Sequence, residues 1–180
     1  MRIQKDKTCA VVVDMQERLF PHIHNHIDLE AKIVTLLRGL RELNVPTLIT
    51  QQYTQGLGPT IPAVTETLND FTHIEKMSFS CWGEPHFHEA LENLGRDHVI
   101  LMGIETHVCV MQTALDLLAH NYTPVVIADA VSSRSHADRD LALARMRQAG
   151  AIITSVEAIL FELCVVAGSP TFKAISRLVK

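Results

Sequence analysis

The sequence has no paired cysteines, no long apolar run and no block of like charge. Its four cysteines, Cys9, Cys81, Cys109 and Cys164, lie far apart and include no C-x-x-C pair. This spacing argues against a disulfide framework and against a zinc cluster. We therefore expect free thiols in a reducing compartment, and we predict a cytoplasmic location.

No apolar segment is long enough to cross a bilayer, and the first apolar run, residues 8–13, is too short for a signal peptide. The 16 basic and 20 acidic residues are spread along the chain, with a formal net charge of -4. We therefore expect neither a membrane nor a nucleic acid as a partner. Repeats and linkers are also lacking, and 180 residues, 47% of them hydrophobic, predict a single domain over residues 1–180.

Apolar strand-like runs alternate with amphipathic helical stretches. The strands are expected at residues 8–13, 45–50, 71–76, 97–103, 124–128 and 151–153. The helices are expected at residues 29–43, 84–94, 106–118 and 135–149, and a further one from 154 onward. This alternation predicts an α/β fold, namely a three-layer α/β/α sandwich around a mostly parallel, Rossmann-like sheet of about six strands. In such folds reactive groups collect at the carboxyl ends of the strands.

The most informative segment is residues 103–110, Gly-Ile-Glu-Thr-His-Val-Cys-Val. It predicts that Cys109 lies in the first turn of a helix, directly after a buried strand, with Thr106 as the N-cap residue. Unpaired N–H groups and the positive end of the helix dipole favour a thiolate there. Such a turn could hold a nucleophile and an oxyanion hole together.

Two further reactive side chains end predicted strands. Asp14 follows the first strand and could accept the proton of a thiol, while Lys76 ends the third strand and could stabilise both anions. The three side chains would meet if their strands lie near each other. Each residue also has a plain structural explanation. Asp14 could cap a turn, Lys76 could be solvated, and Cys109 could be a small core residue.

These residues belong to a longer pattern. It runs through residues 11–16, 75–76, 103–110, 112–117, 129–134 and 160–163. In this order and spacing the chain resembles the isochorismatase-like cysteine hydrolases, a family that includes nicotinamidases and proteins named only for an isochorismatase domain. The resemblance implies a triad of Asp14, Lys76 and Cys109. It also implies a cis peptide between Ile104 and Glu105, which would aim the Glu105 N–H, beside that of Cys109, at a developing oxyanion.

The resemblance further implies hydrolysis of a small amide or related acyl compound through a Cys109 thioester, with Asp14 as general base and Lys76 as charge stabiliser. Family members that act on isochorismate lack this cysteine. Nicotinamidases carry an Asp-x-His metal motif near the second strand, whereas residues 50–56 here read Thr-Gln-Gln-Tyr-Thr-Gln-Gly. We therefore expect no metal and no cofactor. Two alternatives stay open: a catalytically idle binding or scaffold protein, and a redox-sensing thiol protein.

Several loops that follow strand ends could shape a substrate pocket. Leu19, Phe20, Tyr53 and Trp82 could line an apolar, partly aromatic cavity. Core packing or a subunit contact is equally open for Phe20 and Trp82. Arg134 could pair with an anionic substrate group, although a structural salt bridge is favoured.

The apolar stretch at residues 159–166 could be either core or a subunit interface. Relatives in the family commonly assemble, so the resemblance implies a homo-oligomer as well as a small-molecule substrate.

The chain also contains 10 histidines. His22, His24 and His26 are spaced like a metal-binding tract, but Asp28 is the only acidic residue nearby, so a solvated loop is expected. His107 lies beside the nucleophile in sequence. Adjacent helical residues point to different faces, so His107 is not expected to be the catalytic base.

Overall fold

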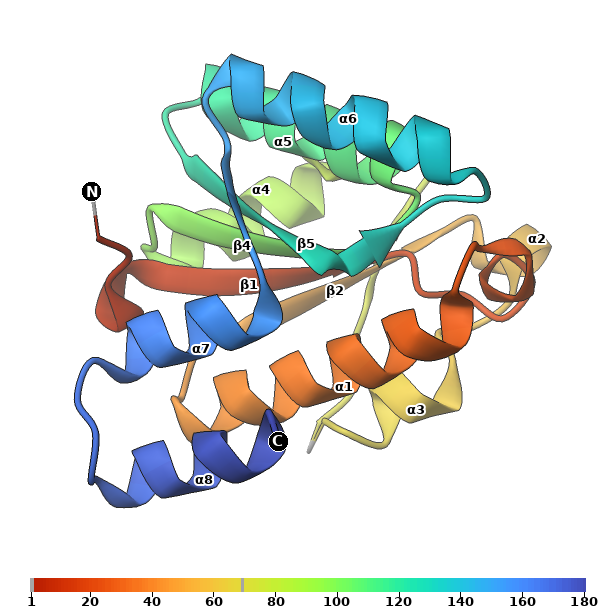
Figure 1. The fold of residues 1–180 in the computed structure, drawn as a ribbon. Coiled ribbons are helices and arrows are strands. Elements are labelled where there is room, and N and C mark those ends of the chain that lie inside the picture. Colours follow the sequence, from red (N-terminus) through yellow and green to blue (C-terminus); the bar gives the residue numbers. More distant parts are fainter. Residues whose placement is uncertain (1, 69) are drawn as a thin grey trace.

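A computed structural model describes residues 2–68 and 70–180, which form a three-layer α/β/α sandwich (Figure 1). The described residues build one six-stranded sheet in the order β3-β2-β1-β4-β5-β6, and every neighbouring pair of strands is parallel. The strands are β1 Thr8–Val13, β2 Thr47–Gln52, β3 Ile74–Lys76, β4 His98–Ile104, β5 Thr123–Ser132 and β6 Ile152–Thr154. The predicted fold class is confirmed, and the strand order is that of a Rossmann sheet.

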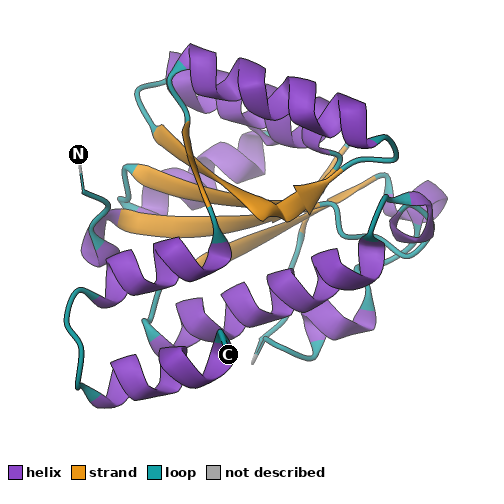
Figure 2. Ribbon diagram, viewed as in Figure 1, coloured by secondary structure: helices purple, strands orange, loops and turns teal. Residues whose placement is uncertain are grey.

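Helices cover both faces of the sheet (Figures 1 and 2). One face carries α1 His26–Glu42, α3 Pro62–Thr65 and α7 Val156–Cys164, and α8 Pro170–Leu178 packs against α1 and α7. The other face carries α4 Pro85–Leu94, α5 Met111–Ala119 and α6 His136–Ala149, and α2 Thr54–Leu57 is one short turn after β2. Short 3₁₀ helices span Lys5–Lys7, Phe20–His22 and Cys81–Gly83, and a π-helical segment spans Thr106–Val110.

The two central strands are buried on both faces, which explains their unbroken apolar sequence. All residues of β1 and of β4 are buried. Successive side chains of a strand point to opposite faces. Ala10 and Val12 therefore join the core under α1 and α7, whereas Val11 and Val13 join the core under α4, α5 and α6. Two cores thus hold the central strands rigidly from both sides.

The chain leaves β1 and β4 toward opposite faces of the sheet. The segment after β1 leads to α1, while the segment after β4 leads to α5 on the other face. Such a switch point opens a crevice outside the carboxyl ends of the two strands, where ligands of open α/β sheets bind. The fold therefore points to this end of β1 and β4 as the place to look for a site.

A glycine lets the ends of β1 and β4 come close together. Gly103 pairs with Val13 in the parallel ladder and has a φ of +116°. A Cβ at this position would lie 2.1 Å from the Val13 carbonyl oxygen. Any other residue would collide with backbone that cannot move aside.

Several element boundaries differ from the prediction. Strand β2 begins and ends two residues later than expected, and β3 keeps only the last three residues of its predicted range. Strand β5 continues to Ser132, beyond a register irregularity against β4. The sequence analysis did not predict α8, which starts at Pro170 with Ser169 as its cap. The apolar pattern did not predict these strand ends, because polar residues form them. Tertiary contacts satisfy the hydrogen bonds of these residues.

The N-cap residues differ in the hydrogen bonds that they make. Glu105, not Thr106, is the N-cap of the π-helical segment, and the buried Thr106 hydroxyl has no hydrogen-bond partner among the described residues. Ser135 precedes α6 but makes no side-chain cap bond. Ser155 does cap α7, because its hydroxyl accepts from the Ala158 N–H at 3.4 Å. Within the described ranges, no helix combines the length and the apolar character that crossing a membrane requires.

Candidate active site

A buried ion pair joins the end of β1 to the end of β3. Lys76 Nζ lies 2.6 Å from Asp14 Oδ2, and the two side chains are 0% and 1% exposed. The ammonium also donates to the carbonyl oxygens of Ser78 and Phe79, each at 3.0 Å. All three of its hydrogens therefore have an acceptor, which is the condition for burying a lysine charge.

The second oxygen of the Asp14 carboxylate is held separately. Thr50, in β2, donates its hydroxyl to Asp14 Oδ1 at 2.8 Å. The Asp14 N–H donates to the Thr50 carbonyl at 3.3 Å, and the Asp14 backbone has a φ of +49°. Each carboxylate oxygen thus has its own donor, so the orientation of the carboxylate is set from two strands.

Cys109 lies at the start of the helix that follows β4. The residue is 4% exposed, and its Sγ lies 3.3 Å from Gln52 Oε1. Its carbonyl accepts from the Thr113 hydroxyl at 2.7 Å, and that hydroxyl accepts from the Cys81 N–H at 2.9 Å. π-Helical turns of this kind occur often at functional sites. Here the turn carries the sulfur at the switch point of the sheet.

The pKa values of the site describe a neutral thiol beside an ion pair. Burial raises the pKa of Cys109, the charge of Asp14 raises it further, and Lys76 opposes both effects without cancelling them. Burial alone would lower the pKa of Lys76, but the charge of Asp14 raises that pKa above its ordinary value. The sequence analysis expected the helix N-terminus to favour a thiolate, whereas burial and the neighbouring carboxylate both raise the pKa of Cys109 and so favour the thiol.

This arrangement has a definite chemical consequence. The site brings together a thiol whose pKa is raised, a carboxylate that can accept its proton, and an ammonium whose pKa is also raised. A thiol that is neutral at rest needs such a base at the moment of attack. Asp14, Lys76 and Cys109, which the sequence analysis selected separately, therefore meet at one place in the fold.

Two glutamines at the site were missed by the sequence analysis. The buried Gln16 donates from Nε2 to the carbonyls of Gln52 (3.0 Å) and Gly58 (2.8 Å), and its Oε1 accepts from the Gln52 N–H at 2.8 Å. This clamp holds the end of β2, where the Gln52 side chain faces Cys109. The available signal was the polar residues that end a buried strand.

The peptide bond between Ile104 and Glu105 is cis. The Glu105 carboxylate accepts from the Arg134 Nε at 3.0 Å and from the Arg134 N–H at 3.2 Å. The Arg134 side chain is 63% exposed. Of the two roles considered for Arg134, the structure therefore contains the salt bridge. The His107 ring lies 2.9 Å from the Ser133 hydroxyl and is occupied by that contact.

Three of the predicted pocket residues have contacts elsewhere. Leu19 and Phe20 pack against the core on the α1 side of the sheet, whereas Cys109 belongs to the opposite core. Trp82 stacks on His120, with ring centroids 4.2 Å apart. Because His120 follows the last residue of α5, this stack lies at the other end of that helix from Cys109.

The remaining predicted pocket residue lies at the rim of the site. Tyr53 follows Gln52, is 46% exposed, and donates its N–H to the Lys76 carbonyl at 3.0 Å. Met77 and Phe79, on the loop after β3, are also exposed. Their carbonyls bond inward, to Gln52 and Lys76 respectively, while their side chains reach solvent. Three exposed side chains, Tyr53, Met77 and Phe79, therefore lie just after the ends of β2 and β3.

The histidine tract does not converge on one point. The His24 ring contacts the ring of His136, and the His26 ring contacts Phe20. No group of three or more potential ligands that could hold a metal ion occurs among residues 2–68 and 70–180.

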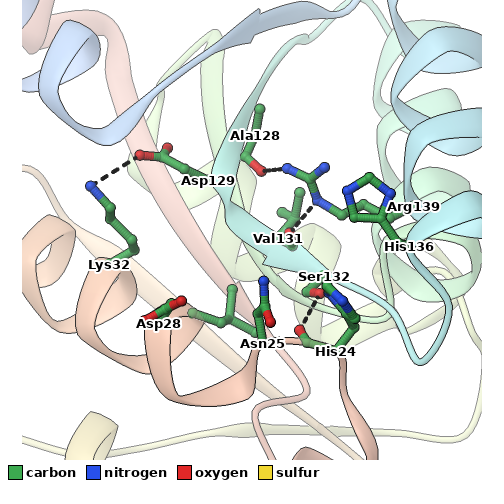
Figure 3. Close-up of a pocket in the computed structure, with 11 residues that line it drawn as sticks. His24, Asn25, Asp28, Lys32, Ala128, Asp129, Val131, Ser132, His136 and Arg139 are labelled. Atoms are coloured by element: carbon green, nitrogen blue, oxygen red, sulfur yellow. Dashed lines mark hydrogen bonds and ion pairs between the residues drawn. The ribbon is translucent and has the colours of Figure 1, made fainter.

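A separate pocket of about 230 Å³ lies between the start of α1, the end of β5 and the start of α6 (Figure 3). Three of its charged side chains bond to one another or to backbone. Lys32 lies 3.6 Å from Asp129, and Arg139 donates to the carbonyls of Val131 (3.1 Å) and Ala128. None of Asp14, Lys76 and Cys109 lines this pocket, so it is distinct from the site at the switch point.

Comparison with known proteins agrees with this fold. The model of the Isochorismatase domain matches residues 8–158, and the chain belongs to this family of hydrolases. The chain is 45% identical to "Secreted isochorismatase effector Isc1" of Phytophthora sojae over 150 residues, which cover 81% of this chain and 71% of that protein. It is 38% identical to "Isochorismatase domain-containing protein 2" of Danio rerio, over 98% of this chain and 89% of that protein.

Solved structures give the same result. The MAR1 ribonuclease from Caenorhabditis elegans has a TM-score of 0.93 at 39% identity, covering 99% of this chain and 92% of that one. YcaC from Pseudomonas aeruginosa, solved with hexane-2,5-diol and covalent acrylamide, has a TM-score of 0.91 at 26% identity, covering 97% and 89%. The Escherichia coli YcaC product, described as an octameric hydrolase of unknown specificity, shares the fold at 24% identity, a TM-score of 0.93 and coverages of 99% and 89%.

Proposed function

We propose that this chain is a cysteine hydrolase that cleaves a small amide or related acyl compound through a Cys109 thioester, without a metal. The observation that carries the proposal is the Asp14 carboxylate. It is buried, held by Lys76 at 2.6 Å and by Thr50 at 2.8 Å, and its charge acts directly on the Cys109 thiol. A buried carboxylate beside a neutral thiol is a proton acceptor for a nucleophile.

In the first step Asp14 takes the proton from Cys109 while the sulfur attacks the carbonyl carbon. The carbonyl oxygen becomes an oxyanion, and we assign the backbone N–H groups of Glu105 and Cys109 as its donors. They belong to the first turn of a helix, where N–H groups lack intrahelical partners. Lys76 keeps its charge and stabilises the developing anions, because its pKa lies above the ordinary value.

In the second step the tetrahedral intermediate collapses and the carbon–nitrogen bond breaks. Asp14 returns its proton to the departing amine, which leaves the acyl group on sulfur as a thioester. Asp14 then deprotonates a water molecule, which attacks the thioester carbon. The carboxylic acid leaves, and Cys109 recovers its proton.

The small exposed fraction of Cys109 favours a small substrate. Only 4% of Cys109 is exposed, which argues against attack on the backbone of a folded RNA even though one relative is named a ribonuclease. Acrylamide, held covalently by the Pseudomonas aeruginosa YcaC, is a small amide that reacts with thiols. That relative therefore holds a small amide, bound through addition to its alkene and not through its carbonyl.

The two alternatives explain the site less well. A scaffold protein has no structural need for a buried ion pair beside a free thiol, since desolvation makes such pairs costly. A redox sensor needs a thiol that ionises readily. Burial and the charge of Asp14 both raise the pKa of Cys109 and so oppose its ionisation.

A panel of small amides tests the proposal, with isochorismate and a short RNA included. Cys109→Ala should abolish turnover of any amide that the chain hydrolyses. Cys164→Ala is the matched control, because this cysteine ends α7 away from the site, and it should keep turnover within about twofold. Full amide turnover by the Cys109 variant would exclude the thioester mechanism. Turnover of isochorismate or RNA alone, unaffected by that variant, would replace it with another reaction.

We also propose a homo-oligomer, located in the cytoplasm. Ile159, Leu160 and Leu163 are core residues, but Val165 and Val166 beyond α7 are exposed apolar residues of the kind found at interfaces. The described structure contains four free cysteines, which fits a reducing compartment, although one relative is named as secreted. Light scattering on the purified chain tests the assembly, and a monomer at micromolar concentration would contradict it.

A further inference from the structure

We propose that Gln52 is a specificity-determining residue that accepts a hydrogen bond from the N–H of an amide substrate and so selects amides over esters. The inference rests on the proposed function, since it concerns the leaving group of the same reaction. It goes further by assigning substrate selection to a side chain outside the three reactive residues.

The position of Gln52 carries the argument. Gln52 is the last residue of β2 and pairs in register with Lys76 at the end of β3. Its Oε1 lies 3.3 Å from Cys109 Sγ. A substrate carbonyl carbon bonded to the sulfur would therefore bring its leaving atom into the neighbourhood of this oxygen.

The orientation of the Gln52 amide is held in place. Gln16 clamps the Gln52 backbone on both its N–H and its carbonyl. On the side chain, Nε2 donates to the Met77 carbonyl at 3.4 Å. Rotating the amide by half a turn would set its oxygen against that carbonyl, so the acceptor faces Cys109.

The acceptor at Oε1 has spare capacity. A carbonyl oxygen can accept two hydrogen bonds, and within the described ranges its only donor is the Cys109 thiol. When Asp14 removes the thiol proton, that donor is lost, and an amide N–H of the substrate can replace it. An ester oxygen carries no hydrogen and leaves the acceptor unpaired, which is how a polar site rejects an analogue lacking a donor. Asp14 still supplies the proton for the leaving group.

The test compares matched pairs of substrates that share an acyl group, p-nitroanilides and p-nitrophenyl esters of acetate, butyrate and benzoate. Gln52→Met keeps the length of the side chain and removes its acceptor. We expect kcat/KM for the anilides to fall by about tenfold to a hundredfold, and kcat/KM for the esters to stay within about threefold. Gln148→Met, the same change on the exposed face of α6, should leave both values unchanged.

The outcomes separate this inference from the proposed function. An equal loss on anilides and esters would mean that Gln52 only positions the sulfur, and no loss on either would mean that it has no role. Both results overturn the inference and leave the hydrolase intact. Should the wild-type chain release no product from any pair in a Cys109-dependent manner, both proposals fail. Gln52→Leu serves as a second apolar variant if Gln52→Met shows a lowered melting temperature.

Discussion

At the scale of single residues, the site depends on hydrogen bonds that orient its charges. One carboxylate oxygen of Asp14 accepts a hydrogen bond from Lys76, and the other accepts one from the Thr50 hydroxyl. The threonine therefore orients the carboxylate without taking part in proton transfer. Threonine in a predicted strand is an ordinary β-former, and nothing in the sequence distinguishes this one. Its role becomes visible only in the fold, where its hydroxyl lies 2.8 Å from Asp14 Oδ1 although the two residues are 36 positions apart in the chain.

Replacing this hydroxyl by a methyl group should lower catalysis more than stability. For Thr50→Val we expect kcat to fall by about tenfold or more with KM little changed, because the carboxylate loses one of its two anchors. The lost buried hydrogen bond should cost about 1 kcal/mol of unfolding free energy.

Thr8→Val is the matched control for that substitution, since the fully buried Thr8 bonds through its hydroxyl to the Gln4 carbonyl at 2.7 Å, remote from Asp14. It should lose similar stability and keep its kcat. Steady-state kinetics and urea unfolding measure both quantities, and equal kcat values in the two variants would refute a positioning role.

At the scale of elements, the reactive groups meet because β1 and β4 run side by side to their ends. Asp14 follows β1 and the Cys109 turn follows β4, and Gly103 allows the closest approach of the two backbones. A clash at this contact would push the two strand ends apart. The distance between the carboxylate and the sulfur is thus set by backbone packing.

Gly103→Ala should therefore reduce both stability and activity. Its new methyl group would lie 2.1 Å from the Val13 carbonyl oxygen, so we expect a loss of more than about 2 kcal/mol of unfolding free energy and little residual turnover.

Gly95→Ala separates backbone strain from collision, because Gly95 also has a positive φ, +60°, but nothing lies within 4 Å of the added Cβ. That control should lose only about 1 kcal/mol and keep its activity. Urea denaturation measures the difference, and similar stabilities would argue against a steric role for Gly103.

At the scale of the whole molecule, the buried thiols tie stability to pH. Burial raises the pKa of Cys9 to about 12 and the pKa of Cys81 to about 11, from an ordinary value of 9.0, and it also raises the pKa of Cys109. Above pH 9 the folded chain therefore holds protons that the unfolded chain has lost. The unfolding free energy is unaffected by these groups at lower pH and falls as pH rises through this window. Lys76, whose pKa is also raised, acts in the same direction.

The alkaline loss of stability should shrink when one buried thiol is removed. For Cys9→Ala we expect the fall in unfolding free energy between pH 9 and pH 11 to be smaller than in the wild type, by on the order of 1.4 kcal/mol per pH unit. Urea unfolding in the presence of a reductant, at pH 8, 9, 10 and 11, measures the slope. Cys164→Ala is the comparison variant. An unchanged slope in Cys9→Ala would contradict the assignment of the effect to buried thiols.

The amino-acid sequence alone determined the alternation of strands and helices, because apolar periodicity reports which faces are buried. It also indicated Asp14, Lys76 and Cys109, since reactive side chains at strand ends stand out against apolar runs. The predicted strand boundaries were wrong where polar residues continue a strand, as at Gln52 in β2 and Ser132 in β5. There the hydrogen bonds that stabilise the extension come from distant segments.

Only the tertiary structure decided how these residues work together. The order of the strands places the carboxyl ends of β1, β3 and β4 close together, and the sequence does not encode that order in any local pattern. The protonation of Cys109 depends on burial and on a charge that lies 95 positions away in the chain, and the contact with Gln52 spans 57 positions. Such properties follow from distances in space, because desolvation and electrostatic effects act between neighbours in the fold, whatever their separation along the chain.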